Sequence, residues 1–205
     1  MQMEERVRHL FGLNIETKIA VADTLSDEIA RAAQRLVNCL LGEGKILVGG
    51  NGGSSANCMH FASSMLHLFE VERPSLPVIN LCSDATSLSS FANENHYGQI
   101  FSRQIQALGQ EKDVLLLLTT SGNSDSMLQA LQAANDRGMD TIALSGRDGG
   151  VLANHLGPED IELRVPSDNT ARIRELHLFI LHCFCDLIDH SLFGQVLGSN
   201  NEYSD

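Results

Sequence analysis

Short continuous apolar stretches alternate along the chain with longer segments in which apolar residues recur every three or four positions. A short apolar run is typical of a strand buried on both faces, and the longer spacing is typical of a helix with one buried face. The predicted strands are 45–49, 77–81, 113–118, 141–144 and 161–165, and the predicted helices are 55–69, 84–92, 97–108, 124–136, 151–155 and 170–190. This alternation predicts an α/β fold, a three-layer α/β/α sandwich of the flavodoxin-like kind around a parallel sheet of about five strands.

The N-terminal segment, residues 1–42, is predicted to be helical. Two helices are expected over 5–41, with a break near 24–27 where Ser26 suits an N-cap. The length of 205 residues suits one domain, predicted over 1–197. Residues 198–205 (GSNNEYSD) are expected to be a disordered tail.

Composition narrows the possible partners and compartment. The net charge of −12 disfavours direct nucleic-acid binding, which needs a basic surface. The sequence shows no signal peptide and no stretch that looks long and apolar enough for a membrane, so no membrane partner is expected. The five cysteines are irregularly spaced without a C-x-x-C pair, which favours a reducing cytoplasm.

Two loops rich in glycine, serine and threonine each follow a predicted strand and precede a predicted helix. They are 49–55 (GGNGGSS) and 119–124 (TTSGNS). Free backbone N–H groups at a helix start, together with hydroxyl donors, suit a phosphate. Serine, threonine and asparagine are also preferred N-caps, so a single such loop would fit plain capping. Two such loops, without the lysine of a P-loop or a full dinucleotide fingerprint, favour a small phosphorylated ligand, most simply a sugar phosphate.

The chain resembles the sugar isomerase (SIS) family, and within it the phosphoheptose isomerase branch, over nearly its whole length. The matching motifs are 50–54 (GNGGS), 59–62 (MHFA), 120–124 (TSGNS) and 171–173 (ARI). The resemblance implies a homotetramer with sites between subunits, and zinc in the isomerase members. It implies a phosphosugar site formed by Asn51, Gly52, Gly53, Ser54, Asn93, Glu94, Thr119, Thr120, Ser121, Ser124 and Arg174.

The resemblance also implies that four residues carry the metal and acid–base chemistry of the isomerases: a His and a Glu on one helix, and a Gln and a His on the last. His60 and His182 are present here, but Ser64 stands at the Glu position and Arg174 at the Gln position. An arginine at that position would repel Zn²⁺. His60, Ser64 and His182 are therefore interpreted as remnants, with no catalytic residue expected. No metal is expected either, His60 and His182 being the only candidates.

Isomerisation needs a base that moves a proton between neighbouring carbons, and a serine hydroxyl is unsuited to that work. Glu70 and Glu72 lie too far along the chain to replace the missing carboxylate by spacing alone. A serine in place of the carboxylate therefore disfavours enzymatic activity.

Further stretches resemble the DnaA initiator-associating (DiaA) branch of the same family. They are 72–77 (ERPSLP), 156–160 (LGPED), 164–167 (RVPS) and 185–189 (CDLID). This resemblance implies a tetramer that binds several DnaA molecules, whose mutual effective concentration it raises. The favoured function is thus a DnaA-binding positive regulator of chromosomal replication initiation, without cofactor. Two alternatives stay open: a phosphoheptose isomerase that converts sedoheptulose phosphate to heptose phosphate for lipopolysaccharide, with zinc, and a sugar-phosphate-sensing SIS protein.

A few residues outside these motifs have two interpretations each. Leu192 and Phe193 are expected to contact either another subunit or a partner. Arg172 suits either a surface ion pair or a phosphate contact. No role is predicted for the remaining candidates, which are His67, His96, Tyr97, His155 and His177.

Overall fold

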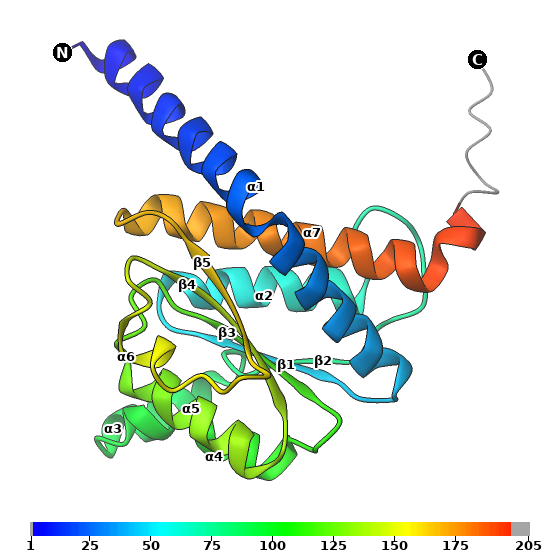
Figure 1. Ribbon diagram of the computed structural model, residues 1–205. Coiled ribbons are helices and arrows are strands. Elements are labelled where there is room, and N and C mark those ends of the chain that lie inside the picture. The colour runs from blue at the N-terminus through cyan, green and yellow to red at the C-terminus, as the bar shows by residue number, and fades with distance from the viewer. Residues whose placement is uncertain (1, 198–205) are drawn as a thin grey trace.

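The computed structural model describes residues 2–197 and shows a parallel sheet between two layers of helices (Figure 1). The strands are β1 (Ile46–Gly50), β2 (Val78–Asn80), β3 (Val114–Leu118), β4 (Asp140–Gly146) and β5 (Ile161–Val165). Every neighbouring pair is parallel, and the strand order is β2-β1-β3-β4-β5. The predicted fold class is confirmed, and each predicted strand is present within a few residues of its expected bounds.

The helices divide between the two faces of the sheet. They are α1 (Met3–Leu41), α2 (Gly53–Leu66), α3 (Ala85–Asn93), α4 (Ser102–Leu108), α5 (Asp125–Asp136), α6 (Gly150–Ala153) and α7 (Thr170–Leu197), with a 3₁₀ turn, η1 (Tyr97–Gln99). Helices α1, α2 and α7 cover one face, and α3 to α6 lie on the other (Figure 1). The single helix predicted over 97–108 is in fact two elements, η1 and α4.

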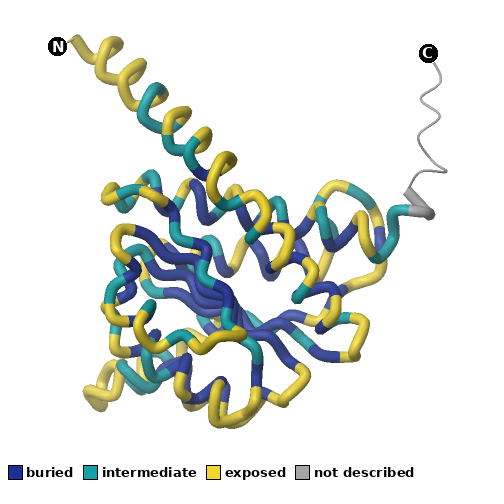
Figure 2. The backbone as a smooth tube through the Cα atoms, in the orientation of Figure 1, coloured by how far each residue is buried: buried dark blue, intermediate teal, exposed yellow. Residues whose placement is uncertain are grey.

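Alternating side chains of the strands supply both cores. Ile46 and Val48 of β1 point toward α1, α2 and α7, whereas Leu47 points toward α4 and α5. In β3 the same alternation places Leu116 in the first core and Leu115 in the second. Because both faces are covered, these strands are apolar throughout, and the sheet is the most deeply buried part of the chain (Figure 2).

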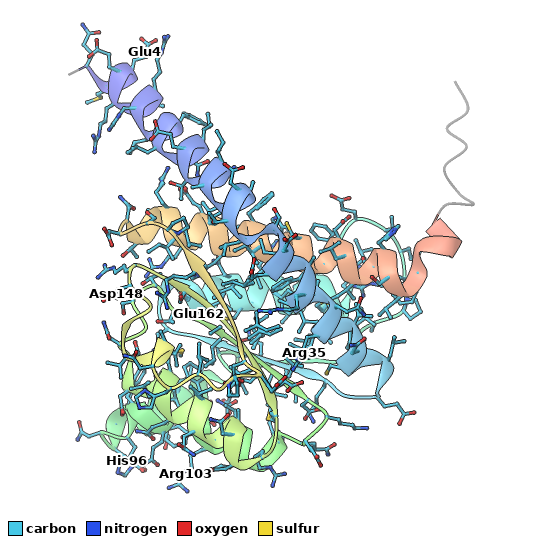
Figure 3. All side chains as sticks on the ribbon, in the orientation of Figure 1. Glu4, Arg35, His96, Arg103, Asp148 and Glu162 are labelled. Atoms are coloured by element: carbon cyan, nitrogen blue, oxygen red, sulfur yellow. The ribbon has the colours of Figure 1, made fainter. Side chains whose placement is uncertain are left out.

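Helix α1 is continuous, so the predicted break near residue 26 is wrong. The Ser26 hydroxyl donates a hydrogen bond to the Ala22 carbonyl (2.6 Å), and the Thr24 hydroxyl donates to the Ala20 carbonyl (2.7 Å). These hydroxyls are satisfied inside the helix rather than at a cap. The C-terminal half of α1 packs on the body and carries Arg35, which is labelled in Figure 3. Arg35 forms an ion pair with Asp140 at the start of β4 (2.7 Å).

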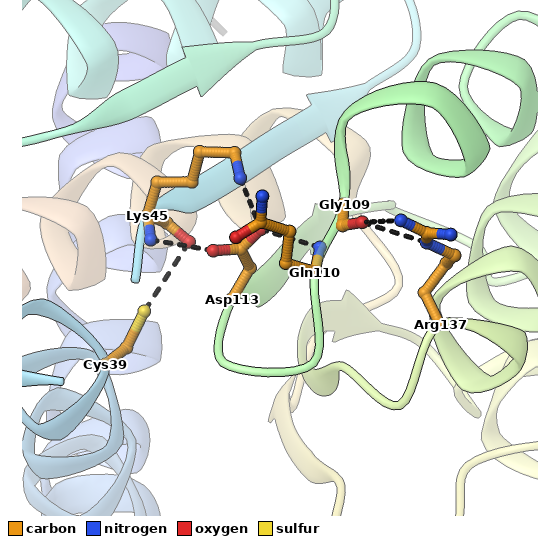
Figure 4. Close-up of polar contacts among 6 residues, drawn as sticks. All are labelled: Cys39, Lys45, Gly109, Gln110, Asp113 and Arg137. Carbon is orange, nitrogen blue, oxygen red and sulfur yellow. Dashed lines mark hydrogen bonds and ion pairs between the residues drawn. The ribbon is translucent and has the colours of Figure 1, made fainter. Parts of the chain in front are cut away.

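A polar network closes the amino-terminal edge of the sheet (Figure 4). The buried carboxylate of Asp113, just before β3, accepts hydrogen bonds from the Lys45 backbone N–H (2.9 Å) and the Gln110 backbone N–H (2.8 Å). Its other contact is an ion pair with the Lys45 ammonium (2.5 Å). This network fixes the starts of β1 and β3, so the opposite, carboxyl-terminal edge carries the free loops.

Helix α7 extends seven residues beyond the predicted end at His190 and thus includes Leu192 and Phe193. Both side chains are partly buried and pack against the core formed with α1 and α2. By length and composition, Thr170–Gly194 could cross a membrane, contrary to the sequence expectation, but it packs along α1 and α2 as a core helix does. The tail predicted over 198–205 lies outside the described residues.

Candidate functional site

The two glycine- and serine-rich loops meet at the point where the order of the strands reverses. The chain passes from β1 to β2 on one side and then returns to β3 on the other side of β1. Loop 50–54 leaves the carboxyl end of β1, and loop 119–124 leaves the adjacent carboxyl end of β3. Crevices at such switch points are the usual ligand sites of open α/β sheets.

A cavity of about 260 Å³ lies between these loops and the first turns of α7. The lining residues are Asn51, Gly52, Ser54, Leu118, Thr119, Thr120, Ser121, Ser124 and Arg174. The structure thus brings together most of the predicted phosphosugar residues. Ser124 is the N-cap residue of α5 but its hydroxyl makes no capping hydrogen bond. That hydroxyl is therefore available to a ligand, which weakens the plain-capping interpretation of the loop.

Arg174 is the only charged side chain among the residues that line this cavity. Its guanidinium lies against Gly53, where a Cβ atom would come within 2.7 Å of Cζ and Nη1. Position 53 therefore has no room for a larger side chain while Arg174 holds this conformation. The Nε–H group of Arg174 is buried and has no hydrogen-bond partner within residues 2–197. A buried, unpaired cationic donor beside hydroxyl groups is well suited to an anion.

Asn51 is held in place by two residues outside the predicted site. Its Nδ2 donates to the Ser126 hydroxyl (2.7 Å), and its Oδ1 accepts from the Tyr97 hydroxyl (3.1 Å). Ser126 lies in the first turn of α5, two residues beyond a predicted motif, so that position could have been found from spacing. Tyr97 lies in η1 and reaches the site only through the tertiary fold.

His60 of α2 and His182 of α7 form a close pair. Their Nε2 atoms are 2.9 Å apart, and their ring centroids are 5.0 Å apart. The Phe69 ring lies against His182, with centroids 5.4 Å apart. Partial burial and the neighbouring His60 lower the pKa of His182 below its ordinary value, although the negative charge of Glu70 opposes this. A neutral His182 can accept a proton near neutral pH.

Glu70 lies nearer to the histidine pair than its sequence spacing suggested. Together with His182, Phe69 and residues of α1 and α7, it lines a largely apolar groove of about 640 Å³. The chain turns back after α2, which returns Glu70 toward α7. Spacing along the chain alone did not predict this placement, which puts the Glu70 and Asp186 carboxylates in the same groove as His182.

The two histidines offer only part of a zinc site. A structural or catalytic zinc ion takes about four ligands in tetrahedral geometry, at least three of them from protein. Within residues 2–197, no group of three His, Cys, Asp or Glu side chains is close enough to hold a metal ion. Ser64 and Arg174 stand where the resemblance implies ligands and cannot replace them. The residues of one chain therefore do not fit zinc.

The remaining predicted residues lie elsewhere. Asn93 and Glu94 are exposed at the end of α3 and do not line the cavity at the switch point. Arg172 forms an ion pair with Glu175 (2.8 Å) and donates to the Leu10 carbonyl (3.1 Å), which agrees with the ion-pair interpretation.

His177, one turn after Arg174, makes the fold sensitive to acid. It is fully buried, and its Nε2 contacts the Ser145 carbonyl (2.9 Å). Burial, aided by the charge of Arg174, lowers the pKa of His177 from 6.5 to about 4, against the opposing effect of the Ser145 bond. Because the unfolded chain takes up this proton below about pH 6.5 and the folded chain does not, stability is lost as the pH falls from 6.5 toward 4.

We expect His177→Gln to reduce the acid sensitivity of folding. In wild type the His177 contribution is roughly 3 kcal/mol between these two pH values, from about 1.4 kcal/mol per pKa unit. Urea unfolding followed by circular dichroism across this pH range measures the slope. The exposed His155→Gln is the control and should keep the wild-type slope. An unchanged slope in His177→Gln would contradict the assignment.

Comparison with known proteins places this geometry in a family. The model of the SIS domain matches residues 14–146. A phosphoheptose isomerase of Halorhodospira halophila is 52% identical over 194 residues, which are 95% of this chain and 98% of that protein. A phosphoheptose isomerase of Chromohalobacter salexigens is 51% identical over the same shares. The solved structure of a phosphoheptose isomerase from Francisella tularensis superposes with a TM-score of 0.89 at 46% identity, covering 93% of this chain and 100% of that one.

These relatives overturn the expectation of a DnaA-binding replication regulator, because they are named for the isomerase activity that the sequence analysis disfavoured. Three of the four stretches that suggested that function contain residues with structural roles. Arg73 and Asp189, from two of them, form a buried ion pair, and Asp160, from a third, accepts a hydrogen bond from the Thr141 backbone N–H. The chain belongs to the SIS domain family, in its phosphoheptose isomerase branch.

Proposed function

We propose that the protein binds a heptose phosphate and interconverts its aldose and ketose forms. The observation that carries this proposal is the placement of two features along the same pair of helices. The cavity with Arg174 and Ser54 lies at the starts of α7 and α2, and the histidine pair lies farther along both helices. His60 follows Ser54 by six residues, which is about 9 Å along a helix axis. That separation is comparable with an extended sugar that carries a phosphate at the end remote from its carbonyl.

Different residues would act on the phosphate end and on the carbonyl end of the sugar. Hydroxyl groups of loop 119–124 and the guanidinium of Arg174 would hold the phosphate and orient the sugar. At the other end, neutral His182 would take a proton from the carbon beside the carbonyl, and His60 would exchange protons with the sugar oxygens. Glu70 would favour the protonated form of His182 that results, because its negative charge raises the pKa of that group.

Proton exchange tests this function directly. The purified protein is incubated with sedoheptulose 7-phosphate in D₂O, and NMR follows both the appearance of the aldose and deuterium incorporation beside the carbonyl. Isomerisation supports the proposal. Its absence, with and without added zinc, would reject it.

A second candidate is binding without turnover, as in a sugar-phosphate sensor. Ser64 and Arg174 favour it, since they stand where the family resemblance implies a carboxylate and an amide. In that case sugar phosphate would raise the melting temperature, because a ligand of the native state stabilises it by mass action, but no deuterium would be incorporated.

Both candidates require Arg174 to bind phosphate. We expect Arg174→Gln to weaken the binding of inorganic phosphate by about 10- to 100-fold, because a hydrogen bond to a charged group is worth about 1.5–3 kcal/mol. Isothermal titration calorimetry measures the affinity. Arg172→Gln, on the same helix but outside the cavity, is the matched control. Equal losses in both variants would point to a general charge effect and contradict the assignment.

We further propose that the protein is a homotetramer. The N-terminal half of α1 projects from the body, and most of its residues are exposed (Figure 2). An apolar stripe runs along one side of it. Its members are Val7, Phe11, Ile15 and Ile19, each between 51% and 66% exposed. A four-residue spacing keeps them on one side of the helix, a pattern that another helix would cover.

A further inference from the structure

Two cysteine thiols lie together at the base of the phosphate loop. Cys58 is fully buried on α2, and Cys82 is partly exposed just after β2. Both contact Gly50, the first residue of loop 50–54. The Cys82 thiol donates to the Gly50 carbonyl (3.2 Å), and a Cβ atom on Gly50 would lie 3.2 Å from the Cys58 sulfur.

Both side chains also lie in the same core cluster, on the face covered by α1, α2 and α7. Hydrogen bonding toward Cys82 raises the pKa of Cys58 well above its ordinary value, and burial adds to that increase. The same hydrogen bond lowers the pKa of Cys82. Cys82 is thus the more reactive of the two, and Cys58 is placed to resolve an oxidised Cys82. The other cysteines differ: burial raises the pKa of Cys39, Cys183 and Cys185.

We infer that Cys82 and Cys58 form an oxidisable pair whose disulfide reshapes loop 50–54 and weakens phosphate binding. The oxidant is a peroxide. The Cys82 thiolate attacks the peroxide oxygen, giving a sulfenic acid and releasing one hydroxide, which is protonated to water. The Cys58 sulfur then displaces that oxygen, which leaves as a second water, and two thiols and one hydrogen peroxide become one disulfide and two waters.

The coupling to the cavity follows from the shared contact with Gly50. When the Cys82 sulfur joins a disulfide, it loses its proton and can no longer donate to the Gly50 carbonyl. Gly50 precedes Asn51 and Gly52 directly, and Ser54 packs beside it, where a Cβ atom on Gly50 would come within 2.9 Å of the Ser54 side chain. A change at Gly50 therefore reaches three residues that line the cavity. This last step rests on the proposed phosphate site.

The experiment compares reduced and peroxide-treated full-length protein. Remaining thiols are blocked with N-ethylmaleimide, and peptide mapping locates any disulfide. Hydrogen exchange of peptides covering 50–55 reports the loop, and calorimetry with inorganic phosphate reports the cavity. We expect a disulfide between positions 58 and 82, faster exchange in the loop, and phosphate affinity lower by about fivefold or more, at the lower end of ordinary coupling between sites. Dithiothreitol should reverse all three.

Variants separate the pair from general oxidation. Cys82→Ser and Cys58→Ala should lose the response, and Cys183→Ser, on another element, should keep it. Cys82 is partly exposed, so its variant remains informative if Cys58→Ala does not fold. Absence of the 58–82 disulfide, or a disulfide with unchanged loop exchange, would overturn the inference. If the reduced protein binds no phosphate, the proposed phosphate site is wrong. Peptide mapping of the disulfide and hydrogen exchange of loop 50–54 would still test the cysteine pair.

Discussion

The Arg73→Met variant is expected to lose about 3–5 kcal/mol of unfolding free energy, because removing one partner of a buried ion pair leaves an uncompensated buried charge. The Arg73 Nε lies 2.7 Å from Asp189 Oδ1, and the two side chains are only 1% and 5% exposed. The guanidinium also donates to the carbonyls of Ser64 (2.9 Å) and Met65 (2.7 Å) at the end of α2. Those terminal carbonyls would lose their partner as well.

Urea unfolding followed by circular dichroism measures this loss. The double variant Arg73→Met/Asp189→Leu removes the stranded carboxylate and should recover much of the stability. Arg172→Met, which breaks the more exposed pair with Glu175, is the control and should change stability by less than about 1 kcal/mol. A loss in Arg73→Met no larger than in this control would show that the buried pair is not a main support of the fold.

The same ion pair connects stability to the site. Arg73 binds the last turn of α2, and Asp189 belongs to α7, so the pair fixes the two helices that carry His60 and His182. Its residues lie in the stretches that suggested a DnaA-binding branch. Arg73 and Asp189 thus have a structural role in the fold.

The sheet and the meeting of the two hydroxyl-rich loops could be predicted because they depend on local signals. Strands covered on both faces read as continuous apolar runs, and parallel strands bring their carboxyl-end loops to one edge. The meeting of loops 50–54 and 119–124 follows from those two facts. The break in α1 was mispredicted because a serine within a helix can satisfy its hydroxyl on the preceding turn, as Ser26 does.

Contacts that depend on the path of the chain could not be predicted. Tyr97 reaches Asn51 across 46 residues, and Glu70 comes near His182 only because the segment after α2 turns back. The position of the Arg174 side chain could not be predicted from the sequence either. Helical periodicity places it with His182 on one side of α7, yet its guanidinium lies at the cavity, against Gly53.

His182→Gln is expected to lower the rate of isomerisation by about 10²- to 10⁴-fold, the usual contribution of a positioned acid or base. The His182 Nε2 lies 2.9 Å from the His60 Nε2, and neither side chain lines the phosphate cavity. Phosphate affinity should therefore stay close to wild type in this variant. Deuterium incorporation into sedoheptulose 7-phosphate measures the rate, and calorimetry with inorganic phosphate measures the affinity. His155→Gln, exposed and remote from the pair, is the control.

The pH profile gives an independent check on the same residue. Because burial and His60 lower the pKa of His182 below 6.5, kcat/KM should fall on the acid side only below that value. His60→Gln removes the neighbouring charge, so it should move the acid limb toward 6.5 as well as slow the reaction. A variant at position 182 that keeps the wild-type rate would remove the pair from the mechanism. If the wild-type protein binds phosphate but incorporates no deuterium into the sugar, Arg174 and loops 50–54 and 119–124 would form a binding site without catalysis. The protein would then be a sensor of sugar phosphates.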